Sequence, residues 1–382
     1  MAGSFKELGS NDIVSTRTLL HEAIPLTGTI VSGTYVNGDT ALNVKNFSHG
    51  MFQSVYDYPY LSSSANHIFD ITVGVSPNTT LTVTSQATKK QNIYNQMAQV
   101  LMGYDHTGSV HEFDEDGNIL AGGTKLREVF FLNFSRLLCK DEIKKGTFEL
   151  ELGEGGSFTT DGTNFLRRIK LTDASGSDGY FTNSPAGEYG VLFAQTTFDG
   201  DTTLNTALIH NESISTLVSD PNTHPPCGLL FYQAGIAVIS GSVFNDNALG
   251  GILDDVDSDA VEMGATFGDT GFNHITGSEI SASADAIRNR IYNLQFNNTT
   301  ELNSTIYFCR ANHNEFNYSA NPTYLSGSKI RVKTNSTDNP VSYITTVGLY
   351  NDNNELMAVA KLSEPLKKTP DTEFTIRTRL DY

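Results

Sequence analysis

Short stretches that alternate apolar with polar residues dominate this chain, and turn-forming residues separate them. Residues 147–152 place Phe148, Leu150 and Leu152 at every second position, which is the pattern of a half-buried strand. Residues 189–198 and 228–240 are apolar enough to form buried strands. In the C-terminal quarter the same strand composition recurs at residues 302–310, 329–333, 342–350, 355–362 and 373–380. The pattern predicts a mainly β protein with antiparallel sheets.

A few helices interrupt this pattern. Residues 89–102 predict a helix that ends at Gly103, because their apolar positions recur at a spacing of i, i+4, i+7 and i+8: Ile93, Met97, Val100 and Leu101. Residues 284–296 predict a second helix, since Ile287, Ile291 and Leu294 would share one of its faces.

Residues 126–138 are apolar enough for a buried helix or a buried strand, and their periodicity does not separate the two. We favour a strand, which a charged turn at 141–146 would connect to the strand at 147–152 as a hairpin. Asn351 to Asn354 form a second turn sequence, because Asn and Asp tolerate positive φ.

Two regions dense in Gly, Ser and Asp, at 153–187 and 245–281, predict long loops. The fold prediction is a mainly β, α+β protein of antiparallel, β-sandwich-like domains. We expect an extended N-terminal arm at 1–35, an α+β domain at 36–153, a loop-rich β domain at 154–282, and a C-terminal β domain with one leading helix at 283–382. The arm would either pack on its own domain or add a strand to a neighbouring subunit.

Charge narrows the classes of partner. The 43 acidic and 25 basic residues give a net charge of −18, so most of the surface would repel a phosphate backbone. Anionic membranes attract polybasic segments, which this composition does not favour. We therefore expect no nucleic acid and no membrane among the partners. Three cysteines without CxxC spacing suggest neither a disulfide framework nor a zinc site.

The sequence contains only weak indications of metal-binding or catalytic residues. Asp255, Asp257 and Asp259 are spaced like the start of a calcium loop, but Ala260 stands where such a loop needs Gly. A solvated loop is the simpler interpretation, and calcium binding stays open. His21 beside Glu22, and His111 near Glu112 and Asp114, suggest simple surface pairs rather than acid–base groups. No phosphate-cradle, dinucleotide or esterase motif is present, so we predict a protein that is not an enzyme and has no cofactor or metal.

Two aromatic clusters are the candidate interface residues. Tyr56, Tyr58 and Tyr60 stand in a segment whose shape Pro59 fixes, so their rings would offer rigid contact area. The second cluster flanks Asn321-Pro322 and consists of Phe316, Tyr318 and Tyr324. Both clusters could equally be core residues of loops that pack on the sheets.

Several segments carry a family resemblance: residues 46–66 (NFSHGMFQSVYDYPYLSSSAN), 93–105 (IYNQMAQVLMGYD), 113–153, 315–323, 345–362 and 379–382. In these segments the chain resembles a poorly characterised group of virion structural proteins from large contractile-tailed marine phages. The resemblance implies a tail or baseplate component, with the neck or the capsid surface as alternatives, and it implies no catalytic residues.

The expected function is therefore that of a non-catalytic virion subunit, assembled in the host cytoplasm. Its partners would be other virion subunits, including copies of itself. A rival prediction is a receptor-binding module that holds glycans on Tyr56, Tyr58 or Tyr324. Another is a tailspike-like hydrolase that uses carboxylates among residues 254–262.

Overall fold

The structure is a computed structural model, which describes residues 5–28, 30–31, 35–37, 40–120, 122–154, 165, 167–173, 180–199, 224–245, 251–253, 270–319, 325–326, 329–330, 335, 337 and 339–382. The chain forms two compact units. The major unit consists of residues 21–300, and the minor unit combines residues 1–20 with residues 301–382. This division differs from the one expected from sequence, because the boundaries expected after residues 153 and 282 both fall inside the major unit.

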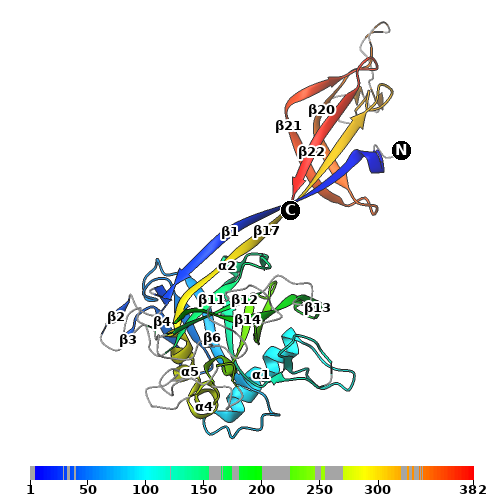
Figure 1. The fold of residues 1–382 in the computed structure, drawn as a ribbon. Helices are drawn as coiled ribbons and strands as arrows, with labels where there is room; N and C mark the ends of the chain where they lie inside the picture. The colour runs from blue at the N-terminus through cyan, green and yellow to red at the C-terminus, as the bar shows by residue number, and fades with distance from the viewer. Residues whose placement is uncertain are drawn as a thin grey trace. The chain divides into compact units, whose positions relative to one another are not determined.

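A continuous antiparallel sheet forms the framework of the major unit (Figure 1). Its strands follow the order β17 (Ile291–Ala311), β11 (Glu149–Glu154), β12 (Arg167–Asp173), β14 (Gly187–Asp199), β15 (Pro226–Phe231), β16 (Ile236–Ser240), β9 (Glu128–Phe134), β6 (His67–Val75), β5 (Gln53–Tyr56) and β4 (Val44–Asn46). Short strands extend it, with β10 (Glu142–Ile143) on β17 and β13 (Tyr180–Ser184) on β14. The prediction of a mainly β fold with antiparallel sheets is confirmed.

Few helices accompany the sheet. Among the described residues they are α1 (Ala87–Leu101), α2 (Arg136–Cys139), α4 (Gly271–Gly277) and α5 (Ile280–Arg288). α1, α4 and α5 all pack against β6 (Figure 1). No helix in the described part of the chain has the length and apolarity that crossing a membrane requires.

The hydrophobic core of the major unit centres on β9, which lies between β6 and β16. Phe130 and Phe131 project from opposite faces of this strand, and both are fully buried. The Phe131 ring leaves no room for a side chain at residue 74, because a Cβ added to Gly74 would lie 2.7 Å from it. β9 therefore has apolar residues on both faces, as a strand buried on both sides should.

Three antiparallel pairings are described for the minor unit, one of them between the short strands β18 (Leu325–Ser326) and β19 (Lys329–Ile330). In another, the C-terminal part of β17 pairs with β22 (Phe374–Asp381) on one side and lies beside β1 (Ile13–Thr27) on the other. In the third, β20 (Ser342–Tyr350) pairs with β21 (Leu356–Lys368). The expected turn at 351–354 connects these two strands, and Asn354 adopts a φ of 64° there. The N-terminal segment is extended, as predicted, and it pairs with a strand of its own chain.

The other local predictions were right in part. α1 confirms the helix at 89–102, and β9 confirms a strand in the ambiguous segment 126–138. The hairpin expected between that strand and residues 147–152 was wrong. β9 pairs with β6 and β16, whereas β11 pairs with β12 and β17.

The helix expected at 284–296 was also wrong in its second half, because α5 ends at Arg288 and β17 begins at Ile291. The register between β11 and β17 shifts after Ile291, so that Tyr292 is an extra residue in the ladder. This bulge lets Ile291 and Leu294 both point inward at a spacing of three residues, which imitates a helical pattern.

Candidate interaction surfaces

The first predicted aromatic cluster lies where β5 ends. Tyr56 is the last residue of β5, and its ring is 6.3 Å from that of Tyr60 and 5.5 Å from that of His67, measured between centroids. Tyr58 instead packs edge-on against Tyr35 at 5.1 Å, and 45% of its surface is exposed. The structure therefore brings Tyr56 and Tyr60 together and pairs Tyr58 with a residue that the sequence did not single out.

Hydrogen bonds hold this loop in a fixed shape. The Tyr60 amide donates to the Leu42 carbonyl at 3.0 Å. The Asp57 carboxylate accepts from the Asn66 amide at 2.7 Å and from the Asn66 side chain at 2.8 Å. A rigid loop with an exposed aromatic ring suits an interface, because few side-chain conformations are lost when a partner binds.

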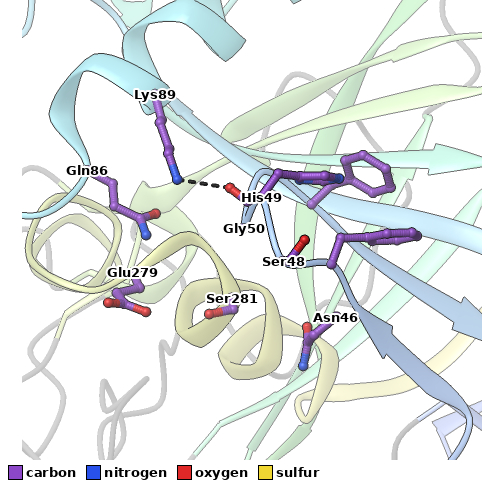
Figure 2. A pocket seen from close by; sticks show the side chains of 10 residues that line it. Asn46, Ser48, His49, Gly50, Gln86, Lys89, Glu279 and Ser281 are labelled. Carbon is purple, nitrogen blue, oxygen red and sulfur yellow. Dashed lines mark hydrogen bonds between the residues drawn. The ribbon is translucent and has the colours of Figure 1, made fainter.

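A pocket of about 290 Å³ lies at the opposite end of the same hairpin, where residues 47–52 connect β4 to β5 (Figure 2). The rings of Phe47 and His49 stack there with their planes 6° apart and their centroids 5.2 Å apart. The Lys89 ammonium, from α1, donates to the His49 carbonyl at 2.9 Å and so ties the loop to the helix.

The other side of the pocket comes from residues at the starts of α1 and α5 (Figure 2). Gln86 precedes α1 in a left-handed conformation, and its side-chain oxygen accepts from the Ile280 amide at 3.1 Å. Glu279 and Ser281 add a carboxylate and a hydroxyl. The pocket thus combines aromatic rings with hydrogen-bonding groups, an arrangement that can hold a small polar ligand.

The second predicted cluster belongs to the minor unit. Phe316 and Tyr318 are 37% and 60% exposed, whereas Tyr324 lies outside the described residues. Phe316 has a φ of 53°, and its carbonyl accepts a hydrogen bond from the Ser342 hydroxyl. The two predicted aromatic clusters therefore belong to different units of the chain.

A fully buried lysine holds the loop that carries Phe316. The Lys368 ammonium donates to the side-chain oxygen of Asn317 at 2.8 Å and to the carbonyls of Thr369 and His313 at 2.8 and 3.2 Å. Each of its three protons has an acceptor, so the buried charge is well compensated.

Sequence reasoning missed an exposed apolar surface on the β20–β21 hairpin. Tyr350 pairs with Leu356, and Gly348 pairs with Val359, so these residues share one face of the hairpin. Phe5 adds its ring to that of Tyr350, with centroids 4.7 Å apart. The alternation at 342–350 and 355–362 could have revealed this surface, but alternation does not say whether the second face is covered.

Two of the candidate acid–base carboxylates form ion pairs with lysines. Glu22 binds Lys140, with 2.7 Å between the charged atoms, and this contact lowers the pKa of the Glu22 carboxyl. Asp114 is buried and forms an ion pair with Lys125. Burial raises the pKa of Asp114, and the Lys125 ammonium partly offsets that effect. Residues 254–262, which include the candidate calcium loop and the candidate hydrolytic carboxylates, lie outside the described residues.

We searched the described part of the chain for metal sites and for reactive cysteines. There, no group of three or more His, Cys, Asp or Glu side chains is arranged to hold a metal ion. The three cysteines are free thiols, and Cys139 and Cys227 are buried. Burial raises the pKa of the Cys139 thiol to about 12, so this thiol is a poor nucleophile.

One buried carboxylate connects three parts of the major unit. Asp173 accepts hydrogen bonds from the backbone amides of Gly146 and Phe148, at 2.5 and 2.9 Å, and from the Tyr232 hydroxyl at 3.1 Å. Burial raises the pKa of Asp173 to about 6, although these donors favour its charged form. The carboxylate fixes the turn that precedes β11.

Comparisons with protein-family models, with curated proteins and with solved structures found no match for this chain.

Proposed function

We propose that this protein is a non-catalytic structural subunit of a phage virion, a tail or baseplate component that assembles with itself and with neighbouring tail proteins. The observation that carries the proposal is the exposed apolar surface of the minor unit. Among the residues that the structure describes, 24 large hydrophobic ones are exposed, and fifteen of these belong to this unit, which holds about a quarter of the chain. Exposed apolar surface on this scale is typical of proteins that function inside an assembly.

The sequence resemblance supports the choice of a phage particle as that assembly. The rigid aromatic loop at Tyr56–Tyr60 offers a further contact surface of the kind found at protein interfaces. The acidic major unit would discourage non-specific contacts with the packaged genome.

Mass spectrometry of purified particles, separated into head and tail fractions, tests the proposal. We expect peptides of this chain in the tail fraction at low copy relative to the major tail subunit. Enrichment in heads would favour a neck or capsid-decoration protein instead. Absence from both fractions would refute the structural role.

The pocket at residues 47–52 favours a second candidate function, the binding of a glycan on the host surface. Aromatic rings such as Phe47 can stack on a sugar while Ser281 and Glu279 accept or donate hydrogen bonds. Calorimetric titration with host polysaccharide should then show binding that Phe47→Ala abolishes and Leu61→Ala, at an exposed residue that does not line the pocket, does not. A flat titration of the unmodified protein would remove this candidate.

A further inference from the structure

The described part of the minor unit buries very few apolar residues fully. Among its described residues only five are buried, and four of these are polar: Ser304, Thr305, Ser342 and Lys368. Ala311 is the one buried hydrophobic residue, whereas the core cluster around β9 lies wholly within residues 26–296. A unit of about 100 residues normally buries well over half of its surface when it folds alone. The described part of the minor unit therefore leaves much of its apolar surface exposed or only partly covered.

Five of the fifteen exposed large hydrophobic residues described in this unit lie on the β20–β21 hairpin: Tyr343, Tyr350, Leu356, Met357 and Val359. We call the residues Phe5, Tyr350, Leu356 and Val359 the hairpin patch; their exposed fractions are 55%, 45%, 52% and 54%. The side chains of Tyr350 and Leu356 approach each other above Gly348, so the patch is continuous. A two-stranded sheet of this kind is marginally stable in water unless one face is covered.

Charge distinguishes the two units. The minor unit has 11 basic and 11 acidic residues, so the whole net charge of −18 resides in the major unit. Ion pairs within the minor unit already use many of its charges: Lys6 with Glu315 at 2.6 Å, Asp12 with Arg310 at 2.7 Å, Arg379 with Asp381 at 2.6 Å, and Arg17 with Glu301. Two copies of this unit can therefore meet without net repulsion, whereas two major units would repel each other.

We propose that the minor unit is a self-association module, in which the hairpin patch docks against the minor unit of a second copy of this chain. A neutral, apolar surface with its charges paired internally is complementary to itself. Other copies of the chain are present wherever the chain is made, so a binding partner for the hairpin patch is always available. The inference deepens the proposed structural function and rests on it, because it names the surface and the partner of the first assembly step.

Sedimentation velocity of the purified full chain, from about 0.1 to about 50 µM, tests the proposal over the range of moderate interface affinities. The unmodified protein should be oligomeric at the upper end of this range. The double variant Leu356→Asp/Val359→Asp should raise the dissociation constant by about 100-fold or more, because two carboxylates would be buried without partners. Leu137→Asp is the matched control, since Leu137 is 66% exposed on the major unit and lies outside the Tyr56–Tyr60 loop, and it should leave the oligomer unchanged.

Hydrogen exchange of the unmodified protein gives a second readout that needs no variant. Backbone amides at 342–362 should become more protected as the protein concentration rises, while those of β9 stay the same. A protein that is monomeric throughout, an oligomer that resists the double variant, or protection that is independent of concentration would each overturn the proposal. A monomeric chain that is still found in phage tails would refute self-association alone, whereas an oligomer that is absent from particles would refute the virion function alone.

Discussion

Replacing Asp173 with Asn should change how the stability of the major unit depends on pH. The carboxylate is 1% exposed, and its pKa is raised from 3.8 to about 6 because burial penalises the charged form. The folded protein therefore binds a proton at Asp173 more tightly than the unfolded chain does. A difference of this size between the two pKa values corresponds to about 3 kcal/mol.

The sign follows from where the proton is bound. Below about pH 4 the carboxyl is protonated in both states, and the folded protein carries no penalty for a buried charge. Between about pH 4 and pH 6 only the folded state keeps the proton, so stability falls as the pH rises. Above pH 6 the loss is complete. The amide side chain of the Asp173→Asn variant does not titrate, so the unmodified protein should gain about 3 kcal/mol relative to this variant when the pH falls from 7 to 4.

Urea unfolding at several values between pH 4 and pH 7 measures this difference. Far-UV circular dichroism is a suitable signal, because the protein is rich in strands and contains no tryptophan. Burial also raises the pKa values of Glu115 and Glu128, but these groups are the same in both proteins and cancel in the comparison. A difference in unfolding free energy that stays constant across this pH range would refute the assignment of Asp173 as a buried, titrating carboxylate.

Three further substitutions test the packing described above. Phe131→Ala should destabilise the major unit by about 3–5 kcal/mol in urea unfolding, because it leaves a cavity beside Gly74; a loss below about 1 kcal/mol would contradict its central place in the core. Lys368→Met removes the ammonium that donates hydrogen bonds to three acceptors, so backbone amides at 312–317 should exchange faster with solvent. Unchanged exchange would show that these hydrogen bonds do not hold the loop. Asn354→Val should destabilise the β20–β21 turn by about 1–2 kcal/mol, because the backbone at residue 354 has a positive φ, whereas Asn354→Gly should be tolerated. Equal hydrogen exchange of the hairpin in the two variants would show that a side chain at residue 354 does not strain the turn.

The sequence predicts local structure well where a pattern has one interpretation. α1 shows this, because Ile93 and Leu101 lie on one buried face and Gly103 follows in a left-handed conformation. The pattern fails where pairing decides the structure. Nothing local to β9 indicates that its neighbours are β6 and β16 rather than the next strand along the chain, and the bulge at Tyr292 gives a strand the spacing of a helix.

The candidate interface residues also divide into those that the sequence indicates and those that only tertiary packing reveals. Tyr58 is conspicuous in sequence, but its exposure and its ring partner Tyr35, which comes from a different segment, could be seen only in the structure. The hairpin patch was missed because alternation predicts one covered face and says nothing of the other. Only burial across the described part of the minor unit shows that a single hydrophobic residue there, Ala311, is fully buried. That is a property of tertiary packing, which a single strand does not reveal.

The pairing of β1 with β17 has a consequence for synthesis of the protein. The hydroxyls of Ser15 and Thr305 lie 3.1 Å apart, yet 290 residues separate them along the chain. At about 5–20 residues per second, a ribosome needs roughly 15–60 s to produce the partner strand after β1 has emerged. During this time the first strand has no mate, and a chain that terminates before β17 never acquires one. The pairing of β1 with β17 therefore forms only late in synthesis, once residues 291–311 have been made.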